Sequence, residues 1–201
     1  MIKCFQNEEP FVRWTEEKFD GRKIHHMNSA SLEKFMKLKC PYNTILFKGD
    51  GAFEFQGTDF QGAFLSFKTD EPITFTECNF TRDMIIRNEG NGAINIVKAS
   101  IGGVKETNTG SILTVTSQGN ICLDQVNDVQ LNDSTIKVRA NEGTVFMHRV
   151  VSDTPIVVAA KFLHTNDCNA NIVLDDVKRY ISENEPAEFV PAYVRKKDLS
   201  I

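Results

Sequence analysis

The sequence lacks the motifs that identify the common enzyme classes and the segments that identify membrane and secreted proteins. It has no G-x-x-x-x-G-K-[ST] loop, no G-x-G-x-x-G after a strand, no G-x-S-x-G and no H-E-x-x-H. We therefore assign no catalytic residue and expect no cofactor. No run reaches the ~18 apolar residues of a membrane span, and "MIKCFQNEEPFVRW" does not resemble a signal peptide. We expect a chain made and kept in the cytoplasm, or in an assembly made there, without a membrane partner.

Excess positive charge and closely spaced cysteines are also missing. The formal net charge is -4 at pH 7, so no overall positive field attracts phosphate backbones, and we expect no nucleic-acid partner. The one basic cluster, Arg195 to Lys197, carries Asp198 beside it and is interpreted as a solvated tail. Free thiols in a reducing compartment, without a metal, explain five scattered cysteines that form no C-x-x-C pair: Cys4, Cys40, Cys78, Cys122 and Cys168.

Phenylalanine is abundant, with 15 residues against 3 tyrosines and 1 tryptophan, and short apolar segments recur at intervals of about 20 residues. Two interleaved series of six members each indicate about six coils. The first series is ILF (45–47), LSF (65–67), MII (84–86), LTV (113–115), IKV (136–138) and IVV (156–158). The second series is FEF (53–55), ITF (73–75), INI (94–96), ICL (121–123), VFM (145–147) and IVL (172–174).

A third apolar point follows the second series in each repeat and changes register near residue 110. Its members are Phe60, Phe80, Ile101, Val126, Val150 and Val177. Short alternating segments between Gly, Asn, Asp and Thr turns are typical of β-strands. Strands this short bury an apolar face only when coils stack at ~4.8 Å. The pattern predicts a β-solenoid with these side chains inside: Phe53, Phe55, Ile73, Phe75, Ile94 and Ile96.

Over roughly residues 43–178, this pattern resembles the right-handed parallel β-helix proteins, such as pectate lyases, phage tailspikes and some cytoskeletal binding domains. The resemblance implies an all-β fold of about six coils and does not extend to a specific family. A sandwich or jelly roll of short strands remains an alternative, because alternation alone does not fix strand order.

Segments at both ends are expected to cover the solenoid, because uncovered strand edges invite aggregation. Residues 1–42 form the predicted N-terminal cap, in which residues 29–39 place apolar side chains on one face of a short helix. Residues 179–201 form the predicted C-terminal tail, which carries Phe189 and Tyr193. This tail either covers the last coil or docks on a partner.

Stacking also creates outward columns of side chains, and one column predicts a ladder of Asp124, His148 and Asp175. Flanking carboxylates favour the protonated imidazole, so His148 is a candidate general acid or base. The ladder is alternatively a stabilising charge pattern, since charges of opposite sign are neighbours in the next column, which contains Glu77, Lys98, Gln125, Arg149 and Asp176.

Two further features concern binding. The first is a set of apolar residues at outward positions, which are covered by the chain's own termini, a partner or a second subunit: Leu46, Ile85, Cys122, Phe146 and Val173. The second is a pair of loops at residues 102–110 and 164–170. In the second loop, His164, Asp167 and Cys168 are too weak a pattern to predict a metal site.

The sequence thus supports two functional hypotheses. The first is a non-catalytic interaction or structural protein that presents rigid faces to a protein partner or to itself. By analogy of fold alone, it would be a viral or phage accessory or virion component. Its predicted binding residues are Phe146, Arg149, Val173, Phe189 and Tyr193. The second is a glycan-binding or glycan-cleaving protein that uses Asp124, His148 and Asp175, with Phe146 as a stacking platform.

Overall fold

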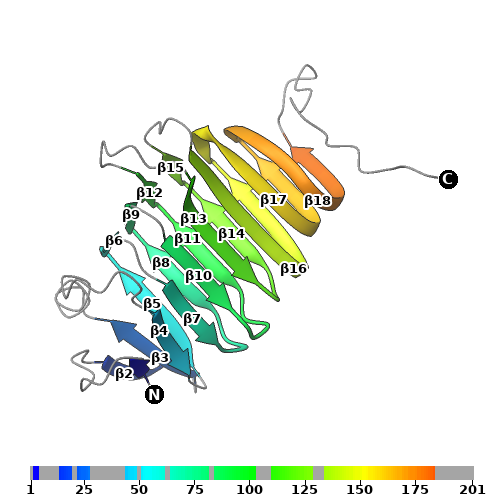
Figure 1. Cartoon of the computed structure of the whole chain (residues 1–201). Helices are drawn as coiled ribbons and strands as arrows, with labels where there is room; N and C mark the ends of the chain where they lie inside the picture. Colours follow the sequence, from blue (N-terminus) through cyan, green and yellow to red (C-terminus); the bar gives the residue numbers. More distant parts are fainter. Residues whose placement is uncertain are drawn as a thin grey trace.

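The chain folds as an all-β parallel solenoid of about five turns, close to the six coils that the repeat predicted (Figure 1). This computed structural model describes residues 2–4, 14–19, 22–27, 44–48, 51–61, 64–81, 84–102, 110–128 and 134–183. The coils stack along one axis, from a hairpin near the N-terminus to β18 at the other end. No helix in these ranges is long and apolar enough to span a membrane.

Three parallel sheets, here called first, second and third, run along the solenoid. The first sheet contains β4 (Thr44–Lys48), β7 (Phe64–Lys68), β10 (Met84–Asn88) and β13 (Gly110–Ser117). The second contains β5 (Ala52–Gln56), β8 (Ile73–Thr76), β11 (Ile94–Val97) and β14 (Ile121–Asp124). The third contains β6 (Asp59–Gln61), β9 (Asn79–Thr81), β12 (Ser100–Ile101) and β15 (Asn127–Asp128).

The last coils consist of long strands that bend from one sheet into the next. These strands are β16 (Ser134–His148), β17 (Val151–Asn166) and β18 (Asn169–Glu183). Residues 162–166 of β17 pair with residues 144–148 of β16 in the second sheet, and residues 156–160 pair with 136–140 in the first. Parallel pairing therefore continues past residue 178, where the sequence suggested that the β-helix ends.

The N-terminal end differs from the rest because it contains antiparallel pairings. β2 (Trp14–Phe19) and β3 (Arg22–Met27) form a hairpin, and β3 also pairs in parallel with β5. β1 (Ile2–Cys4) runs antiparallel to β4. The helix expected at residues 29–39 lies outside the described residues.

The interior of the early coils is a set of stacked phenylalanine rings. One stack lies in each sheet, because equivalent inward positions of consecutive coils carry phenylalanine. The stacked pairs are Phe47–Phe67 at 4.4 Å, Phe55–Phe75 at 4.7 Å and Phe60–Phe80 at 5.3 Å between ring centroids. All six inward residues expected from the sequence are buried, with at most 3% of their surface exposed. In the Phe-x-Phe segment of β5, both phenylalanines therefore point inward and the residue between them points outward.

The register of the coils differs from the sequence prediction at three places. In the first series, Ile86 pairs with Leu65, two residues beyond the predicted partner Met84. The segment 172–174, predicted for the second series, pairs with 156–158 in the first sheet. Two members of the third series, Val126 and Val150, lie at the corner before the third sheet. In that sheet Ile101 pairs with Asp128, two residues beyond its predicted partner Val126. Each difference shifts an element along the chain without exchanging inward and outward sides.

Candidate functional site

Exposed apolar side chains gather on the outer face of the second sheet in the last coils. Phe146, Phe162 and Ile181 are 39%, 44% and 41% exposed, although each lies in a regular strand. Pairing aligns Phe146 with His164 and His164 with Ile181. Phe162 lies two residues before His164 on the same side of β17. The three apolar residues therefore surround His164, and we call them together with His164 the Phe162 patch.

The sheet fixes the spacing within the Phe162 patch. Phe146 and Ile181 lie one strand to either side of His164, so each backbone is ~4.8 Å from that of His164. The ring of Phe146 meets the His164 ring edge to face, with centroids 6.0 Å apart. The Nε2 atom of His164 is shielded from solvent and lies 3.0 Å from Oε1 of Glu183, without the alignment of a hydrogen bond. The patch is thus held by the sheet and by contacts among its members.

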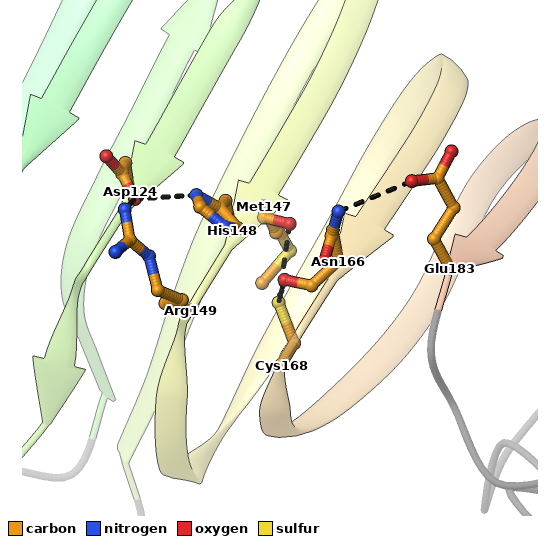
Figure 2. A network of polar contacts seen from close by, with 7 residues as sticks. All are labelled: Asp124, Met147, His148, Arg149, Asn166, Cys168 and Glu183. Atoms are coloured by element: carbon orange, nitrogen blue, oxygen red, sulfur yellow. Dashed lines mark hydrogen bonds and ion pairs between the residues drawn. The ribbon is translucent and has the colours of Figure 1, made fainter.

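A polar ladder runs beside the Phe162 patch, two residues further along each strand. Pairing places Asp124, His148, Asn166 and Glu183 on successive strands. Nδ1 of His148 lies 3.0 Å from Oδ1 of Asp124, and Asn166 donates from Nδ2 to Oε2 of Glu183 at 3.3 Å (Figure 2). We call these four residues the polar ladder.

Arg149 joins the polar ladder through the turn that follows it. At this corner a column of residues adopts positive φ: Gly57, Glu77, Lys98, Gln125, Arg149 and Asp167, with φ between 51° and 59°. The amide of Arg149 donates to the carbonyl of Asn166 in the next coil at 3.0 Å, and the preceding coils repeat this bond. The turn directs the Arg149 side chain outward, and its Nη2 lies 3.2 Å from Oδ1 of Asp124.

The opposite side of the Phe162 patch is charged as well. Lys161, just before Phe162, forms an ion pair and hydrogen bond with Glu142, which hold the pKa of the Glu142 carboxyl below its usual range. Arg179 pairs with Phe162 in the next strand. The patch is therefore an apolar centre with charged residues of both signs on two sides.

Two cysteines lie near the polar ladder, and neither is part of a metal site. Burial raises the pKa of the Cys122 thiol, and the charge of Asp124 raises it further. The Cys168 thiol donates to the carbonyls of Met147 and Asn166, each at 3.3 Å (Figure 2). Within the described ranges, no three His, Cys, Asp or Glu side chains are close enough together to hold a metal ion.

The structure brings only some of the predicted site residues together. Asp124, His148, Phe146 and Arg149 are neighbours on the second sheet, as the columns predicted. Asp175 does not lie in the ladder: His148 pairs with Asn166, and Asp175 is an extra residue in β18 whose Oδ2 lies 3.5 Å from Nη2 of Arg139. The cause is the shift of residues 172–174 into the first sheet.

The remaining predicted binding residues lie elsewhere. Val173 pairs with Val157 on the first sheet, so it does not share a face with Phe146. Phe189 and Tyr193 lie outside the described residues. The residues His164 to Asn166, predicted as part of a loop, belong to β17. Most of the loop predicted at 102–110 lies outside the described residues.

The polar ladder by itself lacks the pair of carboxylates used by most glycoside hydrolases. Asp124 and Glu183 lie three strands apart, so their backbones are about 14 Å from each other. The two carboxyl groups of such enzymes are ~5 to 9.5 Å apart. The exposed ion pairs of Asp124 with His148 and Arg149 contribute at most about 1 kcal/mol each to stability. The ladder therefore orients polar groups beside the patch without forming this catalytic pair.

Sequence reasoning missed Phe162 and Ile181 as exposed residues and placed His164 in a loop. The signal was present, because Phe162 and His164 repeat the Phe-x-His spacing of Phe146 and His148. Comparison with protein-family models, with curated proteins and with solved structures gives no match for this chain.

Proposed function

We propose that this protein is a non-catalytic binding protein that presents the outer face of its second sheet to a protein partner. The observation that carries the proposal is the Phe162 patch, where Phe146, Phe162 and Ile181 stay about 40% exposed on adjacent strands. Outward positions of a solvated sheet are normally polar, so a group of apolar ones indicates a contact surface.

The size and surroundings of the patch favour a protein partner. The two phenylalanines together expose on the order of 170 Å², taking ~200 Å² for a whole aromatic side chain. A stable protein interface buries ~800 Å² on each partner, with an apolar centre and a polar rim. The two rings supply roughly a fifth of that area as an apolar centre, and Arg149, Asp124 and Lys161 supply a rim of both signs.

The test compares the full chain with Phe146→Ser, Phe162→Ser and a matched control, Ile85→Ser. Ile85 is 41% exposed on the first sheet and lies outside the patch. Candidate partners are the proteins retained by both the parent chain and the control, and their retention by the two phenylalanine variants is then compared. The purified partner is then titrated by calorimetry. We expect each phenylalanine variant to weaken binding at least ~30-fold, the scale of a hot spot of about 2 kcal/mol.

Two outcomes would overturn the proposal. The first is a partner that binds all three variants equally, because binding would then not use the patch. The second is binding of a glycan by the parent, lost in Phe146→Ser, with no protein retained; this result would replace the protein partner with a carbohydrate. Unchanged thermal unfolding of each variant serves as the folding control.

A further inference from the structure

The two ends of the solenoid differ in what they offer to another chain. At the N-terminal end, β2 and β3 run antiparallel, so the coil pattern stops there. At the C-terminal end, β18 pairs in parallel with β17 through all three sheets. Among the described residues, no strand pairs with the other edge of β18, which lies at the end of the stack in Figure 1. Within the described ranges, the C-terminal end is therefore a complete coil in which β17 is the one strand paired with β18.

The core is also less covered at this end. Val158 and Ala160 of β17 are 0% and 6% exposed, whereas their partners Leu174 and Val177 in β18 are only partly buried. Ser182 is exposed, although it pairs with Thr165, which is 1% exposed. In the part of the chain that the structure describes, β18 thus presents a strand edge and partly buried apolar side chains together, a combination that proteins normally cover.

The segment after β18 is poorly suited to cover the edge as a regular strand. It includes Pro186 and Pro191 and lies outside the described residues. Alternate residues of a strand direct their amides to the same edge, so prolines five positions apart direct their ring nitrogens to opposite edges. In any such register, one proline faces β18 and removes a hydrogen bond.

We propose that β18 of a second copy of this chain covers the edge, giving a twofold dimer joined end to end. In this dimer the second-sheet part of β18 pairs antiparallel with its own copy about Ile181. Arg179 then lies opposite the partner's Glu183, and Glu183 lies opposite the partner's Arg179. All three side chains point outward from the second sheet, as their pairing with Phe162, His164 and Asn166 requires. The register therefore places opposite charges together twice and apolar residues at the axis.

A second copy suits the edge better than a simple extended peptide. β18 turns corners between three sheets, and another terminal coil has the same bends and the same partly covered apolar interior. Pairing of like ends uses both C-terminal ends and closes the assembly at two chains. Growth into a fibre would need the opposite end, where the hairpin interrupts the coil.

The test is a charge exchange followed by light scattering on the full chain. We expect the parent to have the mass of two chains. Arg179→Glu and Glu183→Arg should each halve this mass, because each variant sets like charges opposite one another twice. The double variant with both changes should recover the dimer. A mixture of the two single variants should form a mixed dimer, because their charges are complementary.

Control variants separate this inference from the proposed function. Phe162→Ser should remain a dimer, and circular dichroism of each charge variant should match that of the parent. A monomeric parent would overturn the inference. Slow amide exchange in β18 of that monomer would then show that the chain covers its own edge. A dimer whose mass is unchanged by Arg179→Glu would also overturn it, since the contact would then lie elsewhere.

Discussion

Replacement of Asn88 tests whether the corner between the first and second sheets holds the coils together. Asn88 is the last residue of β10, and its side chain points inward and is 1% exposed. Its Nδ2 donates to the carbonyls of Thr69 at 3.0 Å and Gly92 at 2.8 Å. Its Oδ1 accepts from the amides of Thr69 at 3.3 Å and Gly90 at 3.1 Å. One side chain thus bonds two turns of adjacent coils.

Asn88→Ala should destabilise the fold by about 4 kcal/mol. This value takes ~1 kcal/mol for each of four hydrogen bonds, whose backbone partners stay buried after the change. For a chain of this length, the loss lowers the melting temperature by roughly 8 to 16 °C. Urea unfolding followed by circular dichroism measures it, as a lower midpoint with an unchanged denaturant dependence.

The matched control is Asn95→Ala on the outer face of the second sheet. Its Nδ2 bonds to Thr74 at 3.4 Å in a partly exposed position, so we expect a loss below about 1 kcal/mol. If Asn88→Ala cost no more than this control, the four bonds would not be stabilising the corner and the reasoning would be wrong. Asn88→Leu should fail to restore stability, because a larger apolar side chain leaves the same backbone groups unsatisfied.

Two further predictions concern the glycines at the corner turns and the thiol of Cys122 beside the polar ladder. Gly119→Ala should cost about 3 kcal/mol or more in urea unfolding, because its new Cβ would lie 2.1 Å from the carbonyl oxygen of Asn91. Gly57→Ala, with no atom within 4 Å but φ of +59°, should cost only about 1 to 2 kcal/mol, and equal losses would contradict this explanation. Alkylation of Cys122, followed by mass spectrometry of its peptide, should require a higher pH than a free thiol, because its raised pKa disfavours the thiolate. Asp124→Asn should lower that pH only in part, since burial is the larger cause, and a full return to ordinary reactivity would refute it.

The sequence predicted which side chains point inward, because alternation along a strand is local. Phe55, Phe75 and Ile96 are buried in the order that the repeat suggested. The regular spacing of the repeat favoured parallel coils over a sandwich or jelly roll, and the pairing of the strands confirms them. Neither conclusion depends on the length of the corners.

The register of the last coils depends on the corners and was therefore not predictable from the repeat. Between the first and second sheets, β16 uses residues 141–143 at the corner, whereas β17 uses Lys161 alone. The shorter corner pairs Phe146 with His164, although the similar sequences around Phe146 and Phe162 suggest that these two align. The one-residue corner also joins the first-sheet and second-sheet parts of β17, so the repeat assigned residues 172–174 instead of 162–166 to the second sheet. That assignment placed Asp175 in the wrong column and hid the grouping of the Phe162 patch. A shift by an even number of residues preserves the inward face, so the apolar pattern gives no warning of it.

The outward column through the patch shows that the proposed binding surface and the stacked aromatic core lie on different coils. It begins with Glu54, Thr74 and Asn95 and continues through Cys122, Phe146, His164 and Ile181. The stacked phenylalanine rings lie inside the early coils, where this column is polar, and the exposed apolar residues of this column lie on the late coils. Removal of exposed rings leaves the buried stacks intact, so changes to the Phe162 patch should alter binding without comparable loss of stability. Ile181 belongs to both the patch and the β18 edge, so the patch is tested through Phe146 and Phe162, which lie on other strands.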